Sequence, residues 1–168
     1  SAFDFNDNST LRVGLALFFV AMMAVGNLRG LKESGKVFAV DGDPEGSDWV
    51  VERFVTAANV NGIVEGSGLD GRIGVLTIDL DGNDFWILRA LDDRWLPDIL
   101  VAEYNATLGP VDALTVPYRA DRRWDHSNFF GASLAALSTL LSRRGLDLVY
   151  CDTHGVNAFF VRRELLDR

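Results

Sequence analysis

Two carboxylates, Asp79 and Asp81, follow an apolar run, Val75 to Ile78, and lead into a Gly82-Asn83 turn. At such a turn a carboxylate can accept hydrogen bonds from ligand hydroxyls or take up a proton as a general base. An amphipathic stretch begins at Asp84. A buried strand that leads through acidic residues into a helix is how open α/β sheets build sites at the carboxyl ends of their strands. We therefore expect chemistry here. The alternative is that Asp81 or Asn83 only caps the helix.

Two other apolar runs end in a similar way. Lys36 to Val40 is followed by Asp41-Gly42-Asp43, and Ile99 to Ala102 is followed by Glu103-Tyr104-Asn105. If these runs are strands of one direction, their carboxyl ends meet at the same edge of the sheet. The sequence then predicts that Asp41, Asp79 and Glu103 border a common cleft.

The elements that must position these residues follow from the apolar periodicity. Thr56 is expected to cap the first helix and Gly145 to end the last one. Arg143 and Arg144 suit the negative carboxyl end of that last helix. The alternation predicts a single α/β domain, residues 1–168, with a mostly parallel sheet and an antiparallel C-terminal edge. Strands are predicted at 36–40, 49–55, 73–78, 99–102, 146–150 and 156–161, and helices at 56–65, 84–91 and 131–144.

The composition excludes several classes of protein. The chain has 168 residues, 48% of them hydrophobic, and its formal charge of −8 argues against binding to nucleic acid. The apolar run Val13 to Val25 is too short for a bilayer, which needs about 20 residues, so no membrane span is expected. Cys151 is the single cysteine, which excludes an internal disulfide and a cysteine metal cluster. We expect no metal and a cytoplasmic location.

Seven segments of the chain occur together in one order: Val37–Pro44, Phe54–Asn61, Leu76–Trp86, Val101–Asn105, Val116–Tyr118, Gly131–Leu134 and Gly155–Arg162. As a set they resemble the class I S-adenosylmethionine-dependent methyltransferase fold, and more closely the FkbM-related bacterial methyltransferase-like proteins. The resemblance covers the chain from about Lys36 to the C-terminus. It implies a Rossmann-like three-layer sandwich that binds S-adenosylmethionine and a small-molecule substrate.

The resemblance also implies roles for single residues. Asp41, Gly42 and Asp43 would form part of the cofactor site, where a carboxylate accepts two hydrogen bonds from the ribose diol. Asn59 and Val60 would lie near the adenine, and Asp79 beside the methyl-transfer position. The substrate would contact Asn83, Glu103 and Asn105. Asp81 or His126 is the candidate base for the proton of an acceptor hydroxyl on a sugar or other small molecule.

The chain departs from the family pattern at its first expected strand. Residues 15–30 lack the acidic, glycine-rich turn that lets backbone approach the cofactor. We therefore expect weak cofactor binding by the isolated chain, and completion of the pocket by a partner subunit, another copy in a homo-oligomer, or a missing segment.

Two alternatives stay open. The chain could be a catalytically inactive binding or assembly module, with Trp49, Trp86, Trp95 and Trp124 as interface or core residues. The Asp79-x-Asp81-Gly82 pattern also resembles phosphatases of the haloacid dehalogenase type, in which Asp79 would attack phosphorus. Against the phosphatase, several elements precede the motif and no Lys follows Lys36.

Overall fold

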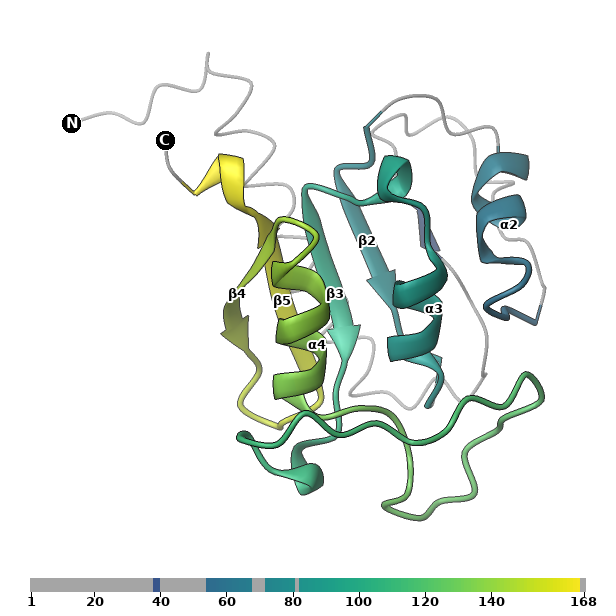
Figure 1. Ribbon diagram of the computed structural model, residues 1–168, viewed down its shortest axis with the longest axis vertical. Coiled ribbons are helices and arrows are strands. Elements are labelled where there is room, and N and C mark those ends of the chain that lie inside the picture. The colour runs from purple at the N-terminus through teal and green to yellow at the C-terminus, as the bar shows by residue number, and fades with distance from the viewer. Residues whose placement is uncertain (1–37, 40–53, 68–71, 81, 167–168) are drawn as a thin grey trace. The chain divides into compact units, whose positions relative to one another are not determined.

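The described residues of the computed structural model, 38–39, 54–67, 72–80 and 82–166, form a mixed sheet with helices packed against it (Figure 1). They all fall within the unit Ser34–Arg168. The predicted α/β class is confirmed. The strands are β1 (Phe38–Ala39), β2 (Val75–Ile78), β3 (Ile99–Glu103), β4 (Leu146–Cys151) and β5 (Asn157–Arg162). The helices are α2 (Val60–Gly66), α3 (Asp84–Ala90) and α4 (Leu134–Ser142), with 3₁₀ turns η1 (Asp93–Trp95), η2 (Ala106–Leu108) and η3 (Arg163–Leu165).

The strand order in this sheet is β1-β2-β3-β5-β4. β2 and β3 pair in parallel, whereas β1 is antiparallel to β2, and β5 is antiparallel to both β3 and β4. β2, β3 and β4 therefore share one direction. The antiparallel C-terminal edge is present. The prediction of a mostly parallel sheet does not hold for the described strands, because β2–β3 is their one parallel pair.

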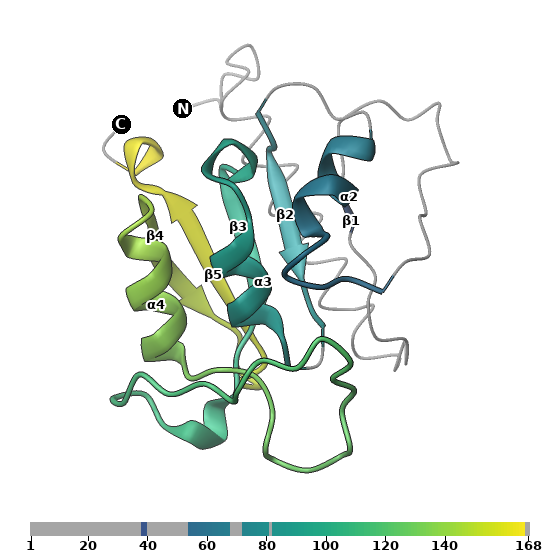
Figure 2. The ribbon, with the colours of Figure 1, turned by 45° about the vertical axis from the view of Figure 1, so that its right-hand side comes forward.

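Alternate residues of the central strands form the core. The pleat sends every second side chain of a strand to the same face, and on one face these are Leu76, Ile78, Leu100, Ala102 and Phe160, all buried. α3 and α4 cover this face side by side (Figures 1 and 2). They contribute buried leucine and isoleucine side chains at helical spacing, namely Ile87, Leu88, Leu137 and Leu141. None of the helices in the described ranges is long and apolar enough to cross a bilayer.

Local capping residues set the ends of α4, whereas the start of α2 differs from the sequence prediction. Ser133 caps α4, because its hydroxyl accepts a hydrogen bond from the Ala136 N–H (3.2 Å). Gly145 has φ of 81°, as predicted for the residue that follows a helix. The predicted helix 56–65 begins later than expected, at Val60. The Asn59 side chain accepts the Thr56 N–H (2.7 Å), so residues 56–59 form a turn and Thr56 does not cap the helix.

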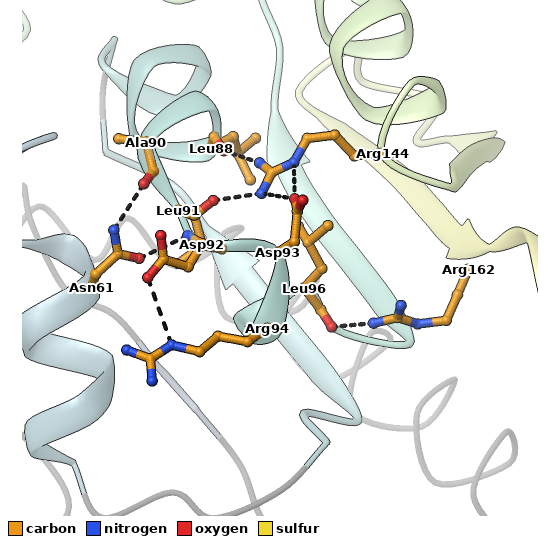
Figure 3. A network of polar contacts seen from close by, with 10 residues as sticks. All are labelled: Asn61, Leu88, Ala90, Leu91, Asp92, Asp93, Arg94, Leu96, Arg144 and Arg162. Atoms are coloured by element: carbon orange, nitrogen blue, oxygen red, sulfur yellow. Dashed lines mark hydrogen bonds and ion pairs between the residues drawn. The ribbon is translucent and has the colours of Figure 1, made fainter.

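The carboxyl end of α3 is held by side chains from two other helical segments (Figure 3). Arg144, just after α4, donates hydrogen bonds to the carbonyls of Leu88 and Leu91 and pairs with Asp93 (2.6 Å). Asn61 of α2 donates to the Ala90 carbonyl (2.9 Å). The last carbonyls of a helix have no partner within it, so these side chains provide the partners and fix α3 between α2 and α4.

Replacing Arg144 with alanine should lower the free energy of unfolding by about 1–3 kcal/mol, because buried carbonyls lose their donors. Urea unfolding followed by circular dichroism measures this. Arg143→Ala is the matched control, since Arg143 is exposed, and it should change stability by at most about 0.5 kcal/mol. Equal losses in the two variants would contradict the assigned role of Arg144.

Candidate functional site

The candidate site lies where β2 and β3 end. Asp79 and Glu103 come directly after the paired residues Ile78 and Ala102, so they occupy neighbouring positions at the end of the parallel pair. Glu103 also pairs with Asn157, the first residue of β5. Ile78 and Ala102 face α3 and α4, so these polar residues belong to the opposite face of the sheet. The segment 104–133 crosses this same edge (Figure 1). The predicted neighbourhood of Asp79 and Glu103 is confirmed.

Part of the predicted site lies outside the described residues, namely Asp41, Gly42, Asp43 and Asp81. Asp41 is expected at this edge only if the strand before it runs in the same direction as β2, but β1 is antiparallel to β2. The carboxyl end of β1 therefore lies at the opposite edge of the sheet from the carboxyl end of β2.

Asp84 organises the turn between β2 and α3. Its side chain is 0% exposed and accepts hydrogen bonds from the N–H groups of Leu80 (2.9 Å) and Gly82 (3.1 Å). The pKa of Asp84 is raised to about 7, mainly by burial and also by the nearby charge of Asp79, while the backbone donors act in the opposite direction. Sequence reasoning treated Asp84 only as the start of a helix. Its spacing with Leu88 and Leu91 places it on the apolar face of that helix, which was the available signal.

Asn83 connects this turn to the crossing segment. It is the residue before α3, yet its side chain makes no capping hydrogen bond, so the capping interpretation of Asn83 is wrong. The amide instead donates to the Arg119 carbonyl (2.8 Å), and its buried oxygen has no hydrogen-bond partner. Arg122 of the same segment lies over Gly82, where a Cβ atom would come within 2.9 Å of its Cδ. Gly82 also has φ of 130°, which residues with a Cβ atom rarely adopt, so the backbone and the packing of Arg122 both favour glycine here.

Asn105 is fully committed to internal contacts. Its amide donates to the carbonyls of Asn128 and Phe130 (both 2.9 Å), and its oxygen accepts from the N–H and hydroxyl of Thr107 (3.0 and 2.5 Å). An asparagine side chain has two N–H donors, so neither is left for a substrate. The geometry gives Asn105 the role of holding the crossing segment to the end of β3.

Asn105→Ala should lower the free energy of unfolding by about 1–3 kcal/mol and speed amide hydrogen exchange around residues 128–131, since two carbonyls lose their donors. Hydrogen exchange read by NMR resolves the local effect. Thr107→Val removes only one of these hydrogen bonds and is the control. The assignment would be wrong if exchange at 128–131 rose no more in Asn105→Ala than in Thr107→Val.

The described residues assigned to the adenine do not fit a ligand contact. The Asn59 side chain donates to the Phe54 carbonyl (3.0 Å) and accepts from Thr56, and Val60 is buried in the core. Their polar atoms and apolar surface are already used within the protein. Asn59 and Val60 therefore do not support the predicted adenine position.

His126 lies on the crossing segment and is exposed. Its φ of 66° is unusual for a residue with a side chain, and its ring centroid is 4.6 Å from that of Trp124. The neighbouring Asp125 accepts from the Ser127 N–H and hydroxyl (3.0 and 2.6 Å), which holds the pKa of Asp125 below its usual value. The backbone conformation of His126 is thus set within a hydrogen-bonded turn.

A second polar group at this edge was missed by sequence reasoning. Tyr104, after β3, shares a hydrogen bond with Cys151 at the end of β4, and burial raises the pKa of both side chains. A raised pKa keeps Cys151 as the thiol near neutral pH, which argues against a nucleophilic cysteine.

Asp152 shapes the β4–β5 turn, where its side chain accepts hydrogen bonds from the N–H groups of Val156 (2.9 Å) and Asn157 (3.1 Å). In the described ranges, no three His, Cys, Asp or Glu side chains are grouped to hold a metal ion.

Comparison with known proteins gives no relative of this chain. No family model, no curated protein and no solved structure matches it. The site is therefore described from its own geometry, with Asp79 and Glu103 at the ends of adjacent parallel strands and Asp84 beneath the turn.

Proposed function

We propose that this chain is a Rossmann-like, S-adenosylmethionine-dependent methyltransferase that acts on the hydroxyl of a sugar or another small molecule. The observation that carries the proposal is the pair Asp79 and Glu103, at the carboxyl ends of the adjacent parallel strands β2 and β3. This is the edge at which open α/β sheets bind ligands. The sequence resemblance over Leu76–Trp86 and Val101–Asn105 supports the same edge.

The two carboxylates beside the β2–α3 turn differ in burial. Asp84 is fully buried and holds the turn through the N–H groups of Leu80 and Gly82. Asp79 is half-buried. Transfer to a hydroxyl needs an aligned acceptor and a base for its proton, and we propose Asp81 or His126 as that base.

An inactive binding or assembly module is the second candidate, and a specific observation favours it. Asn59, Val60 and Asn105, to which the resemblance gives cofactor or substrate contacts, are used up by internal hydrogen bonds or core packing. A fold that keeps its scaffold and loses ligand contacts at these positions would bind a partner rather than turn over a substrate.

Isothermal titration of the full chain with S-adenosylmethionine and S-adenosylhomocysteine separates the two candidates. We expect binding in the high-micromolar range or weaker, roughly −5 kcal/mol. Asp79→Ala should weaken it further, by about 1–3 kcal/mol, because the resemblance places Asp79 beside the cofactor, which would lose a charged acceptor. Arg143→Ala is the control and should leave affinity unchanged. Sub-micromolar affinity would favour a complete methyltransferase site. No binding heat at millimolar ligand would favour the inactive module. The titration is repeated at a high protein concentration, so that a pocket completed by self-association would also be detected.

A further inference from the structure

The crossing segment contains a loop, residues 117–130, that is fixed to the rest of the protein at several points. Asn83 donates to the Arg119 carbonyl (2.8 Å), and Asn105 donates to the carbonyls of Asn128 and Phe130. The Tyr118 hydroxyl accepts the Ala57 N–H (3.1 Å). We call this segment the aromatic loop. A loop held in this way is preorganised, so binding to it costs little ordering entropy.

The aromatic loop exposes apolar rings that it holds in place. Trp124 is 45% exposed and Phe129 is 63% exposed. The indole N–H of Trp124 donates to the Ser127 carbonyl (2.9 Å), and its ring lies 6.2 Å from that of Phe130. Exposed aromatic side chains on a fixed loop supply contact area at low entropic cost and are typical of binding surfaces.

The loop is also locally basic within an acidic chain. It carries Arg119, Arg122 and Arg123 against Asp121 and Asp125, whereas the whole chain has a formal charge of −8. Asp121 pairs with Arg119 (3.4 Å), and Asp125 accepts from Ser127 and lies near the charge of Arg122. The three arginines outnumber the two carboxylates, so the loop keeps a net positive charge within an acidic chain.

Arg122 lies beside the candidate site. Its Cδ packs over Gly82 in the β2–α3 turn, and its guanidinium lies 5.9 Å from the centre of the exposed Phe129 ring. One nitrogen donates to the Pro117 carbonyl (3.2 Å), while its buried Nε has no hydrogen-bond partner. A guanidinium has five N–H donors in a planar fork. The Nε of Arg122 is buried, so the donors that can reach a planar anion are those of its two terminal nitrogens.

We propose that the aromatic loop binds a small sugar that carries an anionic group, a carboxylate or a phosphate. Arg122 and Arg123 bind the anion, because guanidinium groups form paired, charge-assisted hydrogen bonds with such groups. Trp124 and Phe129 pack against the apolar face of the sugar ring. Assigning this sugar as the methyl acceptor rests on the proposed function, whereas its binding to the loop does not.

The test is an NMR titration of the ¹⁵N-labelled full chain, without S-adenosylmethionine, with glucuronate, glucose 6-phosphate or glucose. We expect the Trp124 indole N–H and the Phe129 amide signals to shift with at least one anionic sugar. Whichever of glucuronate and glucose 6-phosphate binds more tightly shows whether the preferred anion is a carboxylate or a phosphate. Glucose should bind at least about tenfold more weakly. Added salt should weaken the anionic sugars and leave glucose unaffected.

Two variants and a control locate the site. Arg123→Gln and Trp124→Ala should each weaken binding of the anionic sugar by about tenfold, and both side chains are exposed, so the fold should be kept. Arg143 follows the carboxyl end of α4, whereas the loop precedes its amino end, so Arg143→Gln should leave binding unchanged. Equal binding of glucose, no shift with either anionic sugar at on the order of 10 mM, or unchanged binding in both variants would overturn the proposal. Shifts at Trp124 that depend only on protein concentration would instead indicate a protein interface.

The sugar titration contains no S-adenosylmethionine, so its result does not depend on whether the chain binds the cofactor. Sugar binding without cofactor binding would keep the loop as a ligand site and reject the methyltransferase. Cofactor binding without sugar binding would keep the proposed function and reject the ligand.

Discussion

Replacing Phe160 with alanine is expected to lower the free energy of unfolding by about 3–5 kcal/mol. Phe160 is fully buried in β5, paired with Leu100 of β3 and Leu148 of β4. Its ring thus lies between β3 and β4, on the face of the sheet that the helices cover. Close-packed cores collapse only partly around a lost ring, so the cost includes a cavity as well as lost burial.

Guanidinium unfolding at several protein concentrations measures this change. Phe129→Ala removes the same ring from an exposed position and should alter stability by at most about 0.5 kcal/mol. A loss below about 1 kcal/mol for Phe160→Ala would show that Phe160 is not packed in the core.

The second large effect is the pH dependence that Asp84 gives to stability. The pKa of Asp84 is raised to about 7 in the folded protein, against about 3.9 in an unfolded chain. Between these values the folded state holds a proton that the unfolded state lacks. The stabilisation is therefore complete below about pH 4 and is lost as the pH rises to 7. About three units at ~1.4 kcal/mol each give about 4 kcal/mol at most.

Asp84→Asn removes this titration, so its stability should vary less than that of the wild type between pH 4 and 7. Groups with lowered pKa values, such as Asp152, lose their stabilisation mainly below that window, as the pH falls through their folded pKa. Asp79→Asn should lower the pKa of Asp84, because the charge of Asp79 raises it. Carboxyl ¹³C NMR reports both values, and a midpoint near 4 for Asp84 in the wild type would refute this assignment.

The sequence by itself determined the elements that carry a local periodic pattern. The predicted helix 84–91 is α3 (Asp84–Ala90), and the predicted strands 99–102 and 146–150 are β3 and β4, each longer by one residue. Apolar spacing and the residues that end an element act over a few positions, so they can be read from the chain. The neighbourhood of Asp79 and Glu103 followed from two such strands.

Tertiary structure alone decided the direction of the strands and the partners of the polar side chains. A strand pattern has the same period in either direction, so the sequence did not show that β1 opposes β2. Arg144 suited the carboxyl end of its own helix, yet it binds the carbonyls at the end of α3. Asn105 was assigned to a substrate and instead holds residues 128 and 130. Such partners lie more than 20 positions away, and only packing of the chain on itself brings them together.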